Sequence, residues 1–414
     1  MKNIKYYYNF VDEKLSIFFI VLMSITNGFA QTDTLRCSSI HHQLEFNIAP
    51  GLLFQTTDFF KGVNSNGKPM DKSISYHLKY GFRFPEDSYF GRLYPKTYQG
   101  IGISLFDFYN YTDLGRPVSV YLYQGSSIFT LNKSLSLDYE WNFGLSFGWK
   151  KYDYNHNPYN TVVGSRLNAY INLGFYLNYQ LSSNLKFKLG GDMTHFSNGN
   201  TKYPNGGVNS VSLRGGLTYC FDTNYSKSSS SNIPVATFKP YWNYDLMIYG
   251  ATRFKGIPDE NYLVPGKFAI VGMNFSPMYN FSKYFRAGVS VDLDYDESAN
   301  LENHIAGTND DHHYTFYRQP FSERFAVGLS ARAEFVMPIF SINFGLGNDI
   351  LYHADSTRGF YQMLALKTSI TRNVYINIGY QLSQFHLPKN LMIGLGYRFY
   401  NKKEPKKALP DILR

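Results

Sequence analysis

Apolar and polar residues alternate with a period of two over several long stretches of this chain of 414 residues. Across residues 135–149 every odd position is Leu, Tyr, Trp or Phe, and every even position is polar or Gly. The same alternation recurs at 167–179, 285–295 and 325–337. Because side chains alternate between the two faces of a β-strand, each stretch predicts a strand with one apolar and one polar face. Trp141 and Trp149 are on the apolar face, which predicts that both contact lipid if the strands cross a membrane.

The length of these stretches and the low charge of the chain favour a membrane location. A strand that crosses the bilayer at a tilt needs about 9–11 residues, and strands of soluble proteins average about 5–6. Only 17% of the residues are charged and 18% are aromatic, whereas soluble domains carry about 25% charged residues. Short turns alternate with long polar loops at 151–163, 197–207, 253–264 and 296–321. We therefore predict an all-β fold, an antiparallel transmembrane β-barrel.

The chain divides into two similar halves. Roughly sixteen strand-like segments lie between residues 41 and 400, and residues 184–221 resemble residues 373–399 in pattern. We predict a first barrel repeat at 37–222, a polar linker at 223–236, a second repeat at 237–400 and a basic tail at 401–414. The repeats form either two eight-stranded barrels in tandem or one merged wider barrel. Cys37 and Cys220 would be neighbours only if the first half closes on itself.

The N-terminus has the features of a secretory signal peptide. Lysines precede an apolar stretch at 15–25, and Gly28 and Ala30 provide small residues for cleavage, so residues 1–30 are predicted to be removed. The formal net charge of +9 fits contact with anionic lipid head groups. No stripe of Lys and Arg with stacking aromatics is present, so nucleic acid is not an expected partner.

One predicted hairpin carries polar residues on its apolar face. His195 and Ser197 continue that face on one strand, and Asn209 shares it on the next. A Ser hydroxyl can attack an ester carbonyl when a His accepts its proton, and an amide oxygen can hold the imidazole in the required tautomer. Backbone N–H groups at Asn198 and Gly199 are candidate donors to the oxyanion. The pattern predicts a serine esterase site that opens toward lipid.

Residues 195–209, HFSNGNTKYPNGGVN, resemble the signature of the outer-membrane lipid A 3-O-deacylase family. The resemblance implies an eight-stranded barrel that removes the ester-linked acyl chain at position 3 of lipid A. It implies that His195 is the base, that Ser197 is the nucleophile and that Asn198 lies beside the oxyanion site. Pro204, Asn205 and Gly207 match the later part of the signature, and Asn205 is a candidate substrate contact.

Asn209 departs from that signature, because the family has Glu at this position. The same residues also resemble outer-membrane phospholipase A, which has Asn as its third member and uses calcium. We therefore predict a lipid A deacylase with a Ser-His-Asn triad, no metal and no cofactor. It acts on lipopolysaccharide in the outer leaflet of the bacterial outer membrane. The alternatives are a phospholipase A, with calcium, and a non-enzymatic porin or structural barrel.

The second half lacks the candidate residues. Gln384 and His386 stand where His195 and Ser197 would repeat, which predicts that this half is not catalytic. The polar loop at 310–313, Asp-Asp-His-His, has no spacing typical of a metal site and is expected to be solvated.

Overall fold

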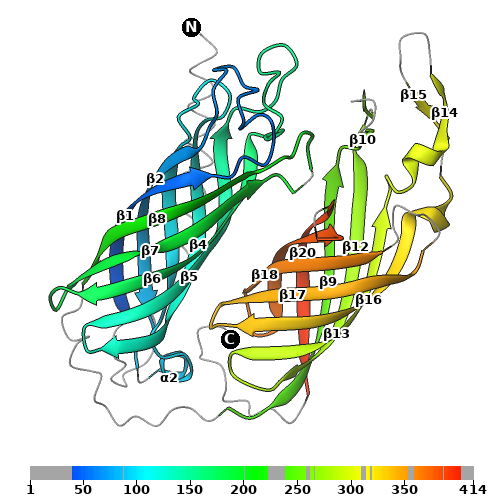
Figure 1. Ribbon diagram of the computed structural model, residues 1–414. Helices are drawn as coiled ribbons and strands as arrows, with labels where there is room; N and C mark the ends of the chain where they lie inside the picture. The colour runs from blue at the N-terminus through cyan, green and yellow to red at the C-terminus, as the bar shows by residue number, and fades with distance from the viewer. Residues whose placement is uncertain are drawn as a thin grey trace, which may run out of the picture.

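The chain forms two closed barrels, each of eight antiparallel strands, in a computed structural model (Figure 1). This confirms the predicted all-β transmembrane barrel. Of the two predicted arrangements of the repeats, the structure has two barrels in tandem and not one merged barrel. The structure describes residues 40–86, 88–199, 201–221, 238–257, 262–264, 266–308, 314–317, 319–352, 359–385 and 387–401. The predicted signal peptide at 1–30, the linker at 223–236 and residues 402–414 of the predicted tail lie outside these ranges.

The first barrel closes by pairing its first strand with its eighth. Its strands are β1 (His41–Leu53), β2 (Lys72–Arg83), β3 (Thr97–Asp107), β4 (Gly115–Asn132), β5 (Leu135–Trp149), β6 (Leu167–Gln180), β7 (Leu185–Ser197) and β8 (Val208–Cys220). The short helix α2 (Tyr89–Leu93) connects β2 and β3. Gln43 of β1 lies opposite Cys220 of β8. Cys37, the expected neighbour of Cys220 in a closed first half, lies outside the described residues.

The second barrel closes by pairing β9 with β20. Its strands are β9 (Tyr241–Arg253), β12 (Phe268–Asn280), β13 (Phe285–Asp296), β16 (Phe325–Val336), β17 (Phe340–Leu351), β18 (Phe360–Ser369), β19 (Val374–Ser383) and β20 (Leu387–Tyr400). Its long loops contain the short ribbons β10 (Gly256–Ile257) with β11 (Tyr262–Leu263) and β14 (Ile305–Thr308) with β15 (Tyr314–Phe316). Among the described residues, every helix is too short or too polar to cross a bilayer.

Paired charges and tyrosines fill the interior of the first barrel. Lys79 Nζ lies 2.8 Å from Glu45 and 2.7 Å from Glu140. Lys188 Nζ bridges the same two carboxylates at 2.8 and 3.0 Å. An eight-stranded barrel is just wide enough for such side chains, whereas the aqueous channel of a porin needs about 16–18 strands. The porin alternative does not fit this interior.

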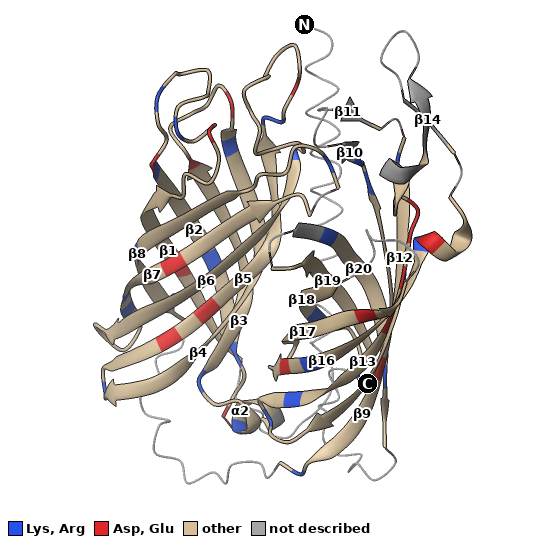
Figure 2. Cartoon of the chain, turned by 45° about the vertical axis from the view of Figure 1, so that its right-hand side comes forward, with Lys and Arg blue, Asp and Glu red and all other residues tan. Residues whose placement is uncertain are grey.

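The second barrel is filled in the same manner, and its charged strand residues appear as bands in Figure 2. Asp245 accepts from Arg398 Nε at 2.7 Å and from Lys367 Nζ at 3.0 Å. Lys367 also binds Glu334 at 3.0 Å, and Arg286 pairs with that same carboxylate. Each of these buried charges thus has a partner of opposite sign, which offsets part of its desolvation cost.

The two barrels contact each other through their outer faces. Trp141 of β5 packs edge-on against Phe340 of β17, with ring centroids 5.5 Å apart. Near the short-turn end, the Tyr94 hydroxyl donates to the Lys283 carbonyl at 2.7 Å. The prediction that Trp141 faces lipid is therefore wrong, because the second barrel covers this part of β5 and leaves the indole 5% exposed.

Candidate active site

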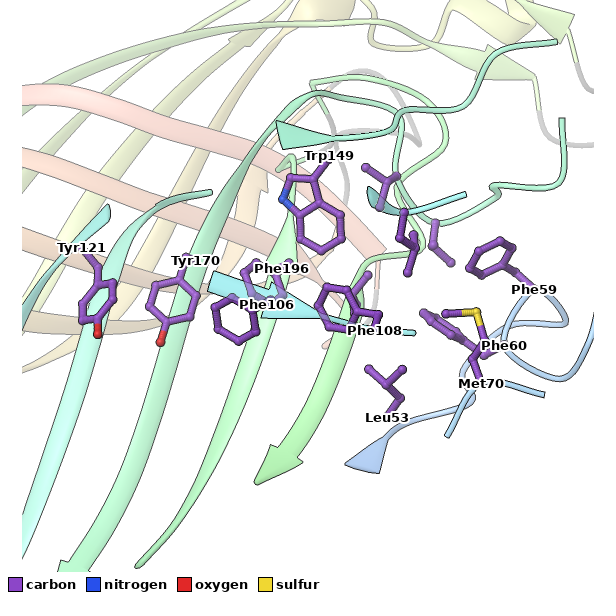
Figure 3. Close-up of a cluster of buried hydrophobic side chains, with 14 of the residues drawn as sticks. Leu53, Phe59, Phe60, Met70, Phe106, Phe108, Tyr121, Trp149, Tyr170 and Phe196 are labelled. Carbon is purple, nitrogen blue, oxygen red and sulfur yellow. The ribbon is translucent and has the colours of Figure 1, made fainter. Parts of the chain in front are cut away.

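The end of β7 is fixed by an aromatic cluster inside the first barrel (Figure 3). Phe196 points into this cluster and is 2% exposed. Its ring centroid lies 4.9 Å from that of Phe106 and 5.0 Å from that of Trp149. Because neighbouring residues of a strand point to opposite faces, an inward Phe196 directs His195 and Ser197 to the outer face.

Trp149 belongs to the same cluster, which corrects the prediction that it contacts lipid. It is 2% exposed, and its indole Nε1 donates to the Ser146 hydroxyl at 2.9 Å. The preceding residue, Gly148, has φ +88°, outside the β region. The pairing of β4 with β5 also shifts register between Gly115 and Val118. The strict alternation therefore ends before Trp149, and its side chain turns inward.

His195 and Asn209 form the best defined contact of the candidate site. They lie opposite each other in the register of β7 and β8. His195 Nδ1 is 2.6 Å from Asn209 Oδ1. An amide oxygen only accepts, so Nδ1 carries the proton in this contact and Nε2 is left as the base. The Asn209 backbone carbonyl accepts from the Phe54 N–H at 2.9 Å, which holds the end of β8 against the loop between β1 and β2.

Ser197 lies two residues beyond His195 on the same outer face, as predicted. Residues i and i+2 of a strand are about 6.6 Å apart along the backbone, within reach of a His and a Ser side chain. Between these two described residues the structure has no hydrogen bond. Catalytic hydrogen bonds are often long before substrate binds. On β6, Ile171 lies opposite His195 and the small Ala169 lies opposite Ser197.

These groups lie on the outer face of the barrel, and this face is apolar and exposed along the strands away from the loop end. Met193, one position before His195 on this face, is 58% exposed, and Leu213 on β8 is 59% exposed. His195, Ser197 and Asn209 are each partly buried. The structure thus places the three candidate catalytic residues together, outside the lumen and at the loop end of the strands.

Asn198 organises the loop that follows Ser197. Its side-chain Nδ2 donates to the Lys202 carbonyl at 3.0 Å, and its backbone N–H donates to Asn205 Oδ1, also at 3.0 Å. The Asn198 N–H is therefore engaged within the loop, and Asn205 has a structural contact. Of the two predicted oxyanion donors, the Gly199 N–H is the one that donates to no described residue.

Gly207 brings the other end of this loop against the imidazole. It has φ +70°, and a Cβ at this position would lie 3.0 Å from the Phe196 carbonyl oxygen and 3.5 Å from His195 Cε1. The Gly207 N–H donates to the Val162 carbonyl at 3.1 Å, so the loop also contacts the connection between β5 and β6. A side chain here would displace either the loop or the His.

The second half differs at the equivalent position. β19 ends at Ser383, and Gln384 follows with φ +53° and an exposed side chain. Phe385, the counterpart of Phe196, is 66% exposed and lies outside its barrel. His386 lies outside the described residues, and the prediction that this half is not catalytic remains a prediction.

No group of three or more His, Cys, Asp or Glu side chains within the described ranges is arranged to hold a metal ion. The loop residues 310–313 fall outside those ranges.

Comparison with known protein families identifies both halves. Residues 72–218 match the family model of lipid A 3-O-deacylase, and residues 242–402 match that of the C-terminal domain of acyloxyacyl hydrolase. With the two barrels, these matches define an outer-membrane β-barrel hydrolase. Residues 72–218 thus belong to the lipid A 3-O-deacylase family, and the protein is an outer-membrane enzyme that removes an ester-linked acyl chain from lipid A.

Solved structures give weaker likenesses. Neisserial surface protein A matches with 11% identity and a TM-score of 0.30, over 44% of this chain and 99% of that one. The outer membrane enzyme PagL matches with 17% identity and a TM-score of 0.26, over 42% of this chain and 97% of that one. A search of curated proteins found no match. The assignment of each half rests on its own family model.

Proposed function

We propose that Ser197, His195 and Asn209 are the catalytic triad of this lipid A deacylase. The observation that carries the proposal is the 2.6 Å contact between His195 Nδ1 and Asn209 Oδ1 on the outer face. It fixes the tautomer in which Nε2 can accept a proton, and Ser197 is the hydroxyl that follows on the same face of β7.

The reaction proceeds in two steps. Ser197 Oγ attacks the carbonyl carbon of the ester, and His195 Nε2 takes the hydroxyl proton. The Gly199 N–H donates to the oxyanion. When the tetrahedral intermediate collapses, the C–O bond to the sugar breaks and His195 returns the proton to the sugar oxygen. Water, deprotonated by His195, then hydrolyses the acyl-serine to release a fatty acid and restore the Ser hydroxyl.

Asn209 orients the imidazole, and it supports the imidazolium less than a carboxylate would, because the amide is neutral. The mechanism uses no metal and no cofactor. The substrate reaches Ser197 sideways from the outer leaflet, since the triad lies on the outer wall of a filled barrel.

Ser197→Ala tests the assignment. The host is a bacterial strain that has an outer membrane but no lipid A deacylase of its own. Mass spectrometry of its lipid A should show the loss of an acyl chain when the wild-type protein is expressed, and intact lipid A when the variant is expressed. Ser183→Ala is the matched control, because this exposed Ser lies in the turn at the other end of β7. Continued deacylation by Ser197→Ala would exclude Ser197 as the nucleophile. Hydrolysis of phospholipid vesicles that a chelator abolishes would instead favour the phospholipase alternative.

A further inference from the structure

The second barrel contacts the loop that carries the candidate oxyanion donor. Gly199 is buried, and a Cβ at this position would lie 3.1 Å from Leu391 Cδ1 and 3.5 Å from Tyr380 Cε2. Tyr380 is on β19 and Leu391 is on β20, and both belong to the outer face of the second barrel. The backbone two residues beyond Ser197 is therefore held between the barrels.

A second contact joins the same loop to the second barrel. The Lys202 ammonium lies 3.8 Å from the ring centroid of Phe254, which directly follows β9. A cation over an aromatic face is attracted by the ring quadrupole. The Lys202 carbonyl is held by Asn198, next to Ser197. Lys202 is thus positioned from both sides, by the active-site loop and by the second barrel.

Three lysines from three different loops lie around this point. Phe254, under the Lys202 ammonium, follows Arg253, which pairs with Phe268, the residue after Lys267. The Tyr152 N–H, next to Lys151, donates to the Val163 carbonyl at 2.7 Å. Lys202 lies in the loop between β7 and β8, Lys151 in the loop between β5 and β6, and Lys267 in the loop between β9 and β12 of the second barrel. Burial lowers the pKa of Lys202, and the positive charges of Lys267 and Lys151 lower it further. The loops of Lys151 and Lys202 are joined, because a Cβ on Gly164 would lie 2.5 Å from the Pro204 carbonyl oxygen.

None of these three lysines forms an ion pair with a carboxylate in the described part of the chain. Like charges close to one another repel, so a cluster of lysines favours an anionic ligand. Lysine ammonium groups bind phosphate as point charges. The substrate of the proposed active site has such groups, because the sugar head group of lipid A is phosphorylated.

We propose that the second barrel completes the substrate site, with Lys267 joining Lys151 and Lys202 to bind a phosphate of the lipid A head group while Ser197 attacks the acyl ester. The proposal rests on the proposed function, since it gives the cluster the same substrate. It assigns a binding task to the second barrel, whose sequence has Gln384 and His386 where His195 and Ser197 would repeat. Lys267 is a specificity residue and contacts no reacting atom.

Lys267→Glu in the full-length protein tests this assignment. With phosphorylated lipid A in mixed detergent micelles, KM should rise about five- to tenfold, the effect of a partly solvated charge contact, while kcat stays unchanged. With chemically dephosphorylated lipid A, the variant and the wild type should have the same KM. Lys267→Arg should keep the wild-type KM for the phosphorylated substrate.

Lys239→Glu is the charge-matched control. This exposed lysine precedes β9 at the short-turn end of the same barrel, so the substitution makes the same change in charge far from the triad. The phosphate assignment would be overturned if the KM of Lys267→Glu stayed unchanged, rose equally with both substrates, or rose no more than that of the control. In each of these cases the activity of the wild type would still support the proposed function. If the wild type releases no fatty acid from either lipid, the proposed function fails and this inference fails with it.

Discussion

Replacing Asn209 by Ala tests how the active site is oriented. The substitution removes the Oδ1 that lies 2.6 Å from His195 Nδ1 and leaves the strand register unchanged. A hydrogen bond to a group that becomes charged contributes about 1.5–3 kcal/mol. This is about a 10- to 150-fold change in rate at about 1.4 kcal/mol per factor of ten. Asn209 is partly exposed, so water replaces some of the lost bond, and we expect the lower part of this range.

The assay is release of fatty acid from purified lipid A by full-length protein in micelles, with kcat and KM measured separately. We expect kcat to fall about 10- to 30-fold and KM to change little, because Asn209 acts on the imidazole rather than on the substrate. Ser197→Ala sets the background rate. A kcat for Asn209→Ala within twofold of the wild type would refute the orienting role.

Asn209→Asp extends the test. The carboxylate keeps an acceptor beside Nδ1 and adds a negative charge that favours imidazolium over neutral imidazole. Because the reaction begins with neutral His195, the acidic limb of the pH profile of kcat/KM should move to higher pH, and kcat at alkaline pH should equal or exceed that of the wild type. A profile that does not move would show that the residue at 209 is not in contact with the base.

Two further substitutions test the support of the site. Gly207→Val places a side chain at φ +70°, 3.0 Å from the Phe196 carbonyl oxygen and 3.5 Å from His195 Cε1. The rate of deacylation should fall more than about tenfold, while circular dichroism shows that the barrel is still folded. Full activity would contradict the close approach of Gly207 to His195. Phe196→Ala removes a ring from the aromatic cluster and should cost about 3–5 kcal/mol of unfolding free energy in a denaturant titration. Phe175→Ala, on the lipid face and 53% exposed, is its control, and equal losses would refute the role of the cluster.

The alternation of apolar and polar residues was sufficient to predict the strands and the outward direction of the site. His195 and Ser197 share parity with Met193, and Asn209 shares it with Val211, so one rule places all three on one surface. The rule holds because nearly every strand residue faces either lipid or the lumen.

The rule failed where a side chain on the apolar face contacts protein rather than lipid. Trp141 is on the outer face of β5, but the second barrel covers it, and contacts between separate sheets leave no periodic signal. Trp149 turned inward because Gly148 leaves the β region, and a Gly in the strand pattern was the only available sign. The engagement of the Asn198 N–H by Asn205 depends on loop geometry, which short-range sequence does not encode.

The outward position of the proposed triad also determines how the turnover rate depends on the amount of lipid. A site on the wall of a filled barrel meets only molecules that diffuse within the same leaflet, and the fatty acid it releases enters that leaflet too. The relevant concentration is then the mole fraction of lipid A in the surface around the protein. Diluting a suspension of membranes should leave the rate per protein unchanged, whereas diluting lipid A with other lipids in the same membrane should lower it.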